Sequence, residues 1–241
     1  MIITIDGPAG AGKSTVAKLL ARRLSERLNH LFAYLDTGSM YRAVVLAGLR
    51  QGVDWDTPAQ LENLARQISI DVRLAQTFLN GENITDIVRT PEVTERIRYA
   101  ADNAVIRTLL VDSQRQIAER NRREGNGLVT EGRDQGTVVF PDSICKFFLT
   151  ATLEERTKRR LGELKQRGID GVFDEVYRQI KDRDDRDSNR PVAPLREPVD
   201  AVRIVSDGMS IDDVVGKMIE IAVERNVASS FVGGDYSPPV V

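Results

Sequence analysis

The sequence predicts an α/β fold in which helices flank a parallel β-sheet. Short apolar or β-branched runs alternate along the chain with segments that carry apolar residues at helical spacing. Two of the later runs, 144–149 and 201–205, are largely apolar throughout, which is typical of parallel strands covered on both faces. A glycine-rich turn joins the first run, Ile2 to Asp6, to the first helical segment. Together these features indicate an open, mostly parallel sheet with helices packed on it.

The remaining elements follow the first strand in a regular order. They are a helix to about Asn29, a strand at 32–35, a helix to Leu49, a helical stretch from about Pro91 to Arg122, and strands at 128–131, 144–149 and 201–205. Capping boxes predict three further helix starts, at Thr57 with Gln60, at Thr152 with Glu155, and at Ser210 with Asp213.

One region, 68–86, departs from this alternation. Short β-branched runs there flank Asn80-Gly81, a dipeptide typical of a tight hairpin turn. We therefore expect residues 60–102 to form a small α+β insertion in the parallel-sheet core. The main domain is then expected to span 1–225, and the Ser-, Gly- and Pro-rich composition of 226–241 predicts a flexible C-terminal tail.

Composition limits the classes of protein to which the chain can belong. Its 241 residues include one cysteine, Cys145, and one histidine, His30, which excludes a disulfide framework and a Cys/His metal cluster. The net charge of −2 gives no reason to expect binding to nucleic acid. No apolar run approaches the length of a membrane span, and the first strand leaves no room for a signal peptide. We expect a cytoplasmic protein that is a monomer and binds no membrane.

Residues 7–14 spell the complete phosphate-binding motif G-x-x-x-x-G-K-[ST] between a strand and a helix. Its glycines let backbone N–H groups point at phosphate oxygens, and the helix that follows adds its positive N-terminal end. Lys13 is expected to reach the β- and γ-phosphates of a nucleoside triphosphate, and the Ser14 hydroxyl is expected to bind Mg²⁺. The residues that we expect to bind ATP are Gly7, Pro8, Ala9, Gly10, Ala11, Gly12, Lys13, Ser14 and Thr15.

Two polar segments follow other predicted strands at the same edge of the sheet. Asp36 and Thr37 come directly after the strand at 32–35, and Arg42 lies in the helix that follows. Arg133 comes between glycines just after the strand at 128–131. Ligands of open α/β sheets bind beyond the carboxyl ends of the strands, so we expect Arg42 and Arg133 to face the crevice of the phosphate-binding loop.

A third charged segment, 183–190, lies late in the chain. At helical spacing Arg183, Asp187 and Arg190 share one face, whereas Arg186 is expected to point elsewhere. Three prolines soon end this helix, and Ser188-Asn189 would stabilise a surface helix poorly. This pattern favours an arginine pair that faces phosphate together with an aspartate that contacts a sugar hydroxyl.

A fourth group combines Arg156, Arg159 and Arg160 with the three glycines that follow them, and it predicts a mobile lid over about 156–172. Several arginines that converge on one crevice would neutralise the oxygens of two phosphate groups. Such a reaction needs no general base, because a phosphate acceptor is already ionised. The charge pattern thus favours phosphoryl transfer between two phosphates.

The chain resembles the bacterial cytidylate kinase family from Ile2 to about Ala222. The resemblance lies in IDGPAGAGKST at 5–15, LDTGSMYRA at 35–43, EGRDQGTVVFP at 131–141 and RDDRD at 183–187. It implies a P-loop NTPase-type sheet with an acceptor-binding insertion and a short lid. It also implies transfer of the ATP γ-phosphate to CMP or dCMP, with Mg²⁺, in pyrimidine nucleotide metabolism. The catalytic residues that it implies are Lys13, Arg133, Arg159, Arg160 and Arg190.

The same resemblance implies an acceptor site. The residues implied to bind CMP are Thr37, Arg42, Arg133 and Arg190 at the phosphate, Arg183 and Asp187 at the sugar, Arg107 and Asp134 at the cytosine, and Asp36, Tyr41 and Arg98 beside them. Two departures concern the base. Arg98 stands where the family has a small hydroxyl residue, and 101–106 lacks the proline that the family would place there.

Two alternatives remain open at this point. The departures at Arg98 and 101–106 allow a nucleoside monophosphate kinase with a different base preference. A P-loop ATPase without a nucleotide acceptor is the second alternative. Against it, the chain has neither an Asn-Lys-x-Asp guanine motif nor an apolar run that ends in an Asp-Glu pair.

Overall fold

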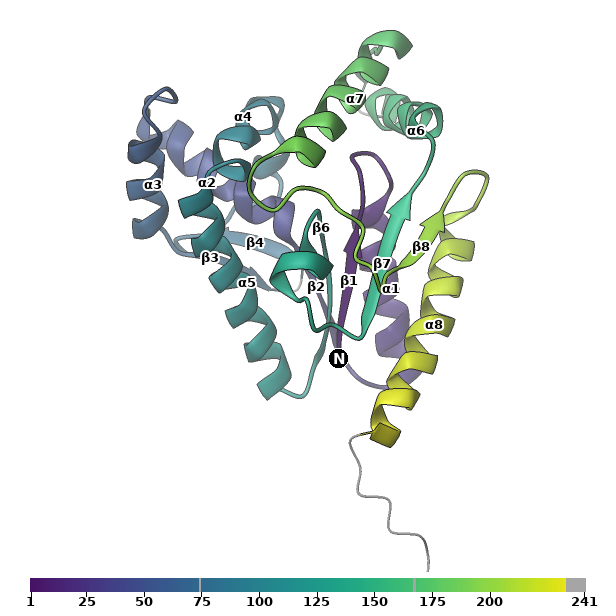
Figure 1. The fold of residues 1–241 in the computed structure, drawn as a ribbon. Helices are drawn as coiled ribbons and strands as arrows, with labels where there is room; N and C mark the ends of the chain where they lie inside the picture. Colours follow the sequence, from purple (N-terminus) through teal and green to yellow (C-terminus); the bar gives the residue numbers. More distant parts are fainter. Residues whose placement is uncertain (74, 167, 233–241) are drawn as a thin grey trace, which may run out of the picture.

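A five-stranded parallel sheet forms the centre of the computed structural model, which describes residues 1–73, 75–166 and 168–232 (Figure 1). Its strands lie in the order β2-β6-β1-β7-β8, and every neighbouring pair is parallel. The strands are β1 (Ile2–Asp6), β2 (Phe32–Asp36), β6 (Gly127–Gly132), β7 (Cys145–Thr150) and β8 (Val202–Val205). The predicted α/β fold with a parallel sheet is confirmed.

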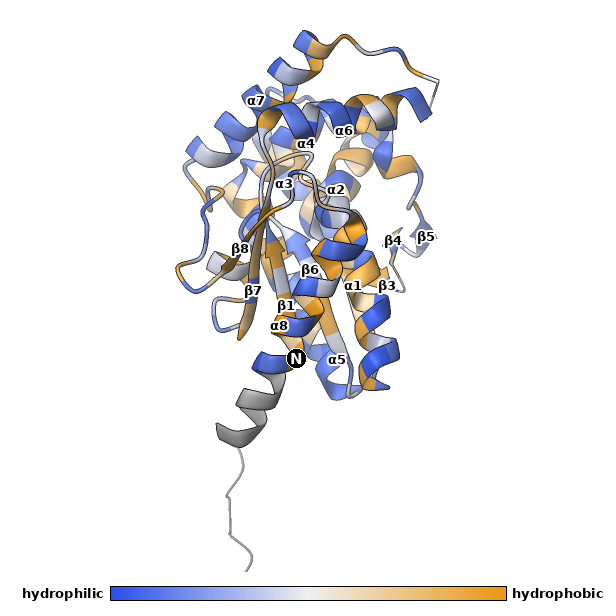
Figure 2. Cartoon of the chain, turned by 90° about the vertical axis from the view of Figure 1, so that its right-hand side faces the viewer, coloured by the Kyte–Doolittle hydropathy of each residue, from blue (hydrophilic) through white to orange (hydrophobic). Residues whose placement is uncertain are grey.

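Helices cover both faces of this sheet. The helices α1 (Lys13–Leu28) and α8 (Ile211–Val232) pack on one face, where they bury Leu20 and Met218 against Phe147 of β7. The helices α2 (Thr37–Gln51) and α5 (Ala104–Arg123) pack on the other face. In Figure 2 the strands between these layers are largely apolar and the outer surfaces of the helices largely polar. Because both faces of the sheet are buried, successive residues of its strands are mainly apolar.

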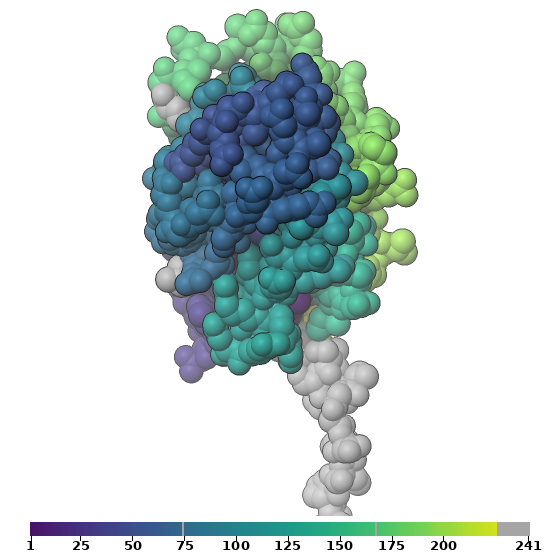
Figure 3. Space-filling view, turned by 90° about the vertical axis from the view of Figure 1, so that its left-hand side faces the viewer, coloured from purple at the N-terminus to yellow at the C-terminus, as the bar shows by residue number. Residues whose placement is uncertain are grey.

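The insertion forms a second small sheet beside the core, in the order β3-β4-β5. Its elements are α3 (Pro58–Gln67), β3 (Ile70–Arg73), β4 (Gln76–Leu79), β5 (Glu82–Asn83), the short helix η1 (Ile87–Arg89) and α4 (Pro91–Ala101). The predicted Asn-Gly turn is confirmed, because Asn80 and Gly81 have φ values of 51° and 85° between the antiparallel strands β4 and β5. In Figure 3 residues of the insertion, in blue, form the upper part of one face of the molecule.

The helical stretch predicted from about Pro91 to Arg122 is two helices, α4 and α5. The break falls at Asp102 and Asn103, where the Asn103 side chain accepts a hydrogen bond of 3.1 Å from the Ile106 N–H and caps α5. The predicted helical stretch is confirmed, and this short polar cap divides it into two helices.

Of the three predicted capping boxes, the one at Ser210 forms in full and the one at Thr57 does not form. The one at Thr152 forms only in part, because the Thr152 N–H donates to Asp207 rather than to Glu155. Ser210 and Asp213 exchange hydrogen bonds of 3.1 Å at the start of α8, and the Glu155 N–H donates to Thr152 Oγ1 over 3.3 Å. The Thr57 hydroxyl instead donates to the Asp54 carboxylate, although α3 still begins at Pro58. Pro58 at the first helical position is sufficient to start this helix.

The predicted lid and tail both contain helix. The helix α6 (Leu153–Gln166) covers most of 156–172 and packs beside α7 (Phe173–Asn189) above the carboxyl ends of the strands (Figure 1). The helix α8 continues to Val232, past the expected start of the tail at 226. The rest of the predicted tail, 233–241, lies outside the described residues. Within the described ranges, no helix is long and apolar enough to cross a membrane.

Candidate active site

The phosphate-binding loop runs from the end of β1 into the N-terminus of α1. Gly7 lies so close to β7 that a Cβ there would be 2.0 Å from the Leu149 carbonyl oxygen. Gly10 and Gly12 have φ values of 74° and 85°, which side chains other than glycine rarely adopt. The glycines of the motif are therefore required by the backbone, and the turn that they form directs the start of α1 into a cleft.

Lys13 is a buried cation at the base of this loop. Its Nζ donates a hydrogen bond of 2.7 Å to the Pro8 carbonyl. Burial, followed by the nearby charge of Arg133, lowers the pKa of Lys13 to about 7, while Glu131 opposes this shift. An anion bound at the loop would supply the negative charge that the buried ammonium lacks. It would therefore offset both the burial of Lys13 and its repulsion by Arg133.

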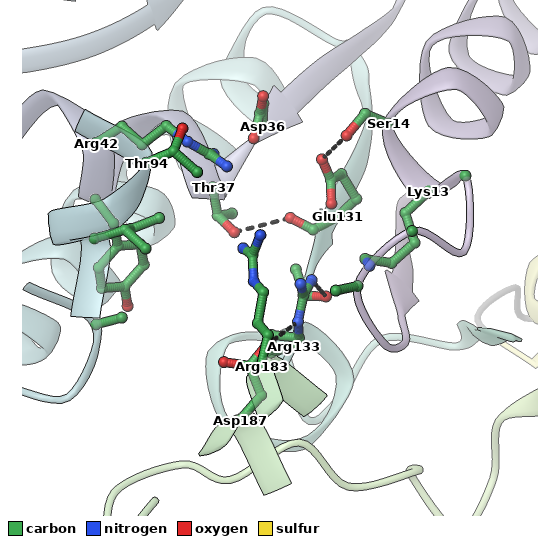
Figure 4. A pocket seen from close by; sticks show the side chains of 18 of the residues that line it. Lys13, Ser14, Asp36, Thr37, Arg42, Thr94, Glu131, Arg133, Arg183 and Asp187 are labelled. Carbon is green, nitrogen blue, oxygen red and sulfur yellow. Dashed lines mark hydrogen bonds and ion pairs between the residues drawn. The ribbon is translucent and has the colours of Figure 1, made fainter. Parts of the chain in front are cut away.

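Ser14 and Glu131 join the loop to the end of β6. The Ser14 hydroxyl donates a hydrogen bond of 2.6 Å to Glu131 Oε1, and the Tyr34 hydroxyl donates to the same oxygen over 3.3 Å. Burial, with the nearby charge of Asp36, raises the pKa of the Glu131 carboxyl. Thr37 Oγ1 also donates to the Glu131 carbonyl over 2.8 Å, which brings the start of α2 to the same point (Figure 4).

The oxygens of Ser14 and Glu131 are hard ligands of the kind that Mg²⁺ prefers. No group of three or more His, Cys, Asp or Glu side chains in the described parts of the chain could hold a metal ion. This donor set fits Mg²⁺ in the form usual for triphosphate sites, where one or two protein oxygens act together with phosphate oxygens and water.

Several arginines gather on the other side of the cleft. Figure 4 places Arg42 opposite Lys13, with Arg133 and Arg183 between them. Burial and the charges of Arg133 and Arg42 lower the pKa of Arg183 to about 10, and burial also lowers the pKa of Arg42. So many like charges in one place are unfavourable unless an anion neutralises them.

Two buried guanidinium nitrogens lack a hydrogen-bond acceptor among the described residues, and they are Arg42 Nε and Arg190 Nη2. Such donors normally have partners in native structures. Gly38 keeps the space around Arg42 open, since a Cβ there would lie 2.9 Å from Arg42 Nη1. These unsatisfied donors indicate a site for an oxyanion.

A buried ion pair of Arg107 and Asp134 lies deeper in the cleft. The guanidinium of Arg107 stands 5.5 Å from the ring centroid of Tyr41, and Arg190 Nη2 is 4.0 Å from the other oxygen of Asp134. A guanidinium and a carboxylate side by side present a row of donors and acceptors of the kind that recognises the edge of a base.

Most of these groups line one cleft of about 1220 Å³ at the carboxyl ends of the parallel strands. The predicted site residues that line it are Ala9, Gly10, Gly12, Lys13, Ser14, Thr15, Asp36, Thr37, Tyr41, Arg42, Arg98, Arg107, Arg133, Asp134, Arg160, Arg183, Asp187 and Arg190. Gly7, Pro8, Ala11 and Arg159 do not line it. Residues from seven separate segments thus come together at the predicted edge of the sheet.

Some of the predicted residues are already engaged by other groups of the chain. Asp36 caps α2 by accepting from the Ser39 N–H over 3.0 Å, and its other oxygen pairs with Arg89. Arg159 donates to the Ser206 carbonyl over 2.7 Å, at the end of β8. Arg156, expected in the lid, is buried against the phosphate-binding loop.

Other residues that line the cleft were not predicted from the sequence. Arg186 lines the cleft although helical spacing pointed it elsewhere, so that expectation was wrong. Arg89 reaches the cleft from the insertion, and only the fold could show this. Lys18 could have been found, because it lies one helical turn after Ser14 on α1.

A phosphate-binding loop and an arginine cluster that share one cleft of a parallel α/β sheet define a P-loop kinase that uses ATP. The model of the family described as cytidylate kinase matches residues 3–224, and the chain belongs to this family.

The chain is also similar to curated cytidylate kinases over nearly its whole length. It is 46% identical over 221 residues to that of Desulforamulus reducens, an alignment that covers 90% of this chain and 94% of the relative. It is 44% identical over 233 residues to that of Geobacter sulfurreducens, with 95% of each chain covered. It is 42% identical over 224 residues to that of Caldanaerobacter subterraneus, with 93% of this chain and 95% of the relative covered.

Proposed function

We propose that the protein transfers the γ-phosphoryl group of ATP to CMP or dCMP, giving ADP and CDP or dCDP. One observation carries this proposal. The cleft contains a complete phosphate-binding loop at one side and, at the other, arginines whose buried nitrogens lack acceptors. The first feature suits a triphosphate, and the second suits a further phosphate that approaches it.

The donor half of the site is built from residues 7–15. The backbone N–H groups of the loop and the N-terminus of α1 hold the β- and γ-phosphates, and Lys13 pairs with the same oxygens. Arg159 and Arg160 both lie on α6. Arg160 lines the cleft, whereas the Arg159 side chain donates to the Ser206 carbonyl just after β8. A Cβ on Gly12 would be 4.0 Å from Arg159 Nη1, so this arginine is close enough to approach the triphosphate.

Ser14 and Glu131 would hold Mg²⁺ with their side-chain oxygens. When bound, the ion neutralises phosphate oxygens and aligns the γ-phosphate. The Ser14 hydroxyl, which donates to Glu131 Oε1 over 2.6 Å, keeps both oxygens at the mouth of the loop.

The acceptor half holds the nucleoside monophosphate. Thr37, Arg42, Arg133 and Arg190 bind its phosphate, Arg183 and Asp187 bind the sugar, and Asp36 and Tyr41 support them. Asp134 accepts from the exocyclic amino group of cytosine while Arg107 donates to the acceptors beside it. Uracil has an oxygen where cytosine has this amino group, so Asp134 would repel UMP.

In the transfer step an oxygen of the acceptor phosphate attacks the γ-phosphorus, and the bond from the γ-phosphorus to the bridging oxygen of ADP breaks. The attacking oxygen is already ionised, so no side chain has to remove a proton. Lys13, Arg133 and Arg190 stabilise the charge that spreads over the transferred group. The side chains thus contribute position and positive charge.

The test compares initial rates with Mg²⁺-ATP and four acceptors, CMP, dCMP, UMP and AMP, and without any acceptor. We expect phosphorylation of CMP or dCMP to be fastest and ATP turnover to require an acceptor. A faster rate with UMP or AMP would establish the altered base preference that Arg98 allows. ATP turnover that is independent of acceptor would establish an ATPase.

We further infer that the enzyme acts as a monomer in the cytoplasm. All side chains assigned above come from one chain, so the cleft requires no partner. Light scattering coupled to size exclusion tests this inference, since a mass of twice 26.8 kDa would contradict it.

A further inference from the structure

Ala9, in the middle of the phosphate-binding loop, is held by two helices at once. Its N–H donates a hydrogen bond of 2.9 Å to Asp184 Oδ1 of α7. Its carbonyl accepts a hydrogen bond of 2.9 Å from Arg156 Nη1 of α6. Both polar groups of this one residue are therefore bound by side chains that lie more than 140 positions further along the chain.

Arg156 and Asp184 also bind each other, since Arg156 Nη1 pairs with Asp184 Oδ2. Arg156 Nε donates to the Ala151 carbonyl over 3.0 Å, which ties the pair to the end of β7. The side chains of Arg156 and Asp184 are only 9% and 17% exposed. A shielded pair with these further hydrogen bonds is geometrically specific, and removing one partner would leave a buried charge unpaired.

The apolar contacts at this point reinforce the link. Ala9 packs with Val176 and Ile180 of α7 in a small apolar cluster. A Cβ on the neighbouring Gly10 would lie 3.3 Å from Arg156 Cβ, so α6 also packs closely against the loop. The contacts with α6 and α7 therefore set the position of the loop.

The helix α7 carries the acceptor side of the cleft on its other residues. Arg183 precedes Asp184 and lines the cleft. Asp187, one turn after Asp184, accepts a hydrogen bond of 2.7 Å from Arg133 Nε. A shift of Ala9 would therefore move α7, and α7 would move Arg183 and Arg133.

We propose that Asp184 and Arg156 form a positioning pair that couples the triphosphate half of the cleft to the acceptor half. The proposal rests on the proposed function, because it assigns the two halves to ATP and a nucleoside monophosphate. Neither residue touches a substrate. Each acts through Ala9, so that binding of one nucleotide places the groups that bind the other.

The test is equilibrium binding by calorimetry, with CMP and a non-hydrolysable ATP analogue, each measured alone and in the presence of the other. In the wild-type protein each ligand is expected to tighten the other by at least about fivefold, the lower end of typical coupling between sites. In Asp184→Asn the affinity for each ligand alone should stay within about threefold, while the coupling falls to within about twofold of none.

Arg156→Lys is the second variant, because it keeps the cation and the fold while losing the hydrogen bonds of the guanidinium. Asp185→Asn is the matched control, since Asp185 is the exposed next residue of α7. It should show wild-type coupling. Asp184→Asn and Arg156→Lys, unlike the control, should also lower kcat more than they raise the KM of either substrate.

Two results would overturn the proposal. One is wild-type coupling in both Asp184→Asn and Arg156→Lys, even with a lower melting temperature, which would make the pair a structural one only. The other is a wild-type protein that phosphorylates CMP but binds the two nucleotides independently. Failure of the proposed function is a separate result, namely a wild-type protein that does not phosphorylate CMP.

Discussion

Arg133 Nε donates a hydrogen bond of 2.7 Å to Asp187 Oδ2, and this contact joins the turn after β6 to α7. The two side chains are 15% and 18% exposed, so water screens the pair only weakly. The nearby charge and the hydrogen bond of Asp187 outweigh the effect of burial and raise the pKa of Arg133. Arg133 thus stays a fixed cation between the two halves of the cleft.

Arg133→Ala should lower kcat for CMP by about a hundredfold or more, which is the usual cost of losing one contact that stabilises charge in a transition state. ATP should still bind, because Lys13 and the loop are unchanged. Steady-state kinetics and calorimetry of ATP binding measure the two effects. Arg122→Ala is the control, since Arg122 pairs with Glu119 at an exposed position on α5. Near-normal turnover in Arg133→Ala would remove Arg133 from the catalytic residues.

We expect Lys13 to take up protons when ATP binds. Burial lowers the pKa of Lys13 in the empty cleft, and phosphate oxygens would raise it again. ATP binding should therefore take up protons, and the uptake should be larger at pH 8 than at pH 6. Calorimetry in two buffers of different ionisation enthalpy measures the uptake.

Lys13→Arg provides the control for this proton, because arginine keeps the charge and stays protonated at pH 8. The variant should bind ATP without proton uptake. An equal uptake in the variant and in the wild-type protein would assign the proton to another group.

The sequence was sufficient for the features that depend on neighbouring residues. The phosphate-binding loop, the Asn80-Gly81 turn and the Ser210 capping box are local patterns whose backbone requirements a few residues set. The strand ends were predictable for a related reason. Parallel strands place their carboxyl ends at one edge, so Arg42 and Arg133 were expected to face the same crevice, and both line it.

Contacts between distant segments could not be predicted in this way. Arg156 appeared to belong to a lid, because a row of arginines before glycines gives no indication of a partner at Asp184. Arg89 carries no local signal for its contact with Asp36 across the edge of the insertion. The choice of partner for such charged side chains depends on tertiary packing, which brings together residues that no spacing relates.

We expect Arg98 to affect how strongly the enzyme prefers CMP over UMP. Its guanidinium stands 4.9 Å from the ring centroid of Tyr99 and donates to the Tyr99 hydroxyl over 3.1 Å, at the rim of the cleft. Arginine only donates hydrogen bonds, so it favours the O4 acceptor of uracil over the amino group of cytosine. Arg98→Ser should raise the ratio of kcat/KM for CMP to that for UMP by about fivefold, the equivalent of roughly 1 kcal/mol.

Arg96→Ser is the matched control for this prediction. Arg96 lies on the same helix, stands over Trp55 and does not line the cleft. Its substitution should leave the ratio of the two acceptors unchanged. An unchanged ratio in Arg98→Ser as well would mean that Arg98 does not contact the base.

We expect the free energy of unfolding to depend on pH through the buried side chain of Asp6. It is fully buried at the end of β1, and its two oxygens accept hydrogen bonds of 2.8 Å and 2.7 Å from the N–H groups of Gln135 and Gly136. Burial outweighs these hydrogen bonds and raises its pKa from 3.8 to about 6. The folded state therefore holds the Asp6 proton more tightly than the unfolded state does.

Because the folded pKa of Asp6 is the higher one, its contribution to the free energy of unfolding decreases as pH rises from about 4 to about 6 and is constant outside this window. Asp6→Asn has no such titration. The stability of the wild-type protein relative to Asp6→Asn should therefore fall by about 2 to 3 kcal/mol between pH 4 and pH 7 in urea unfolding followed by circular dichroism. Asp200→Asn should show the opposite sign, because pairing with Lys146 lowers the pKa of Asp200 and its contribution is lost as pH falls. A constant difference between wild type and Asp6→Asn across this range would show that Asp6 titrates alike in both states.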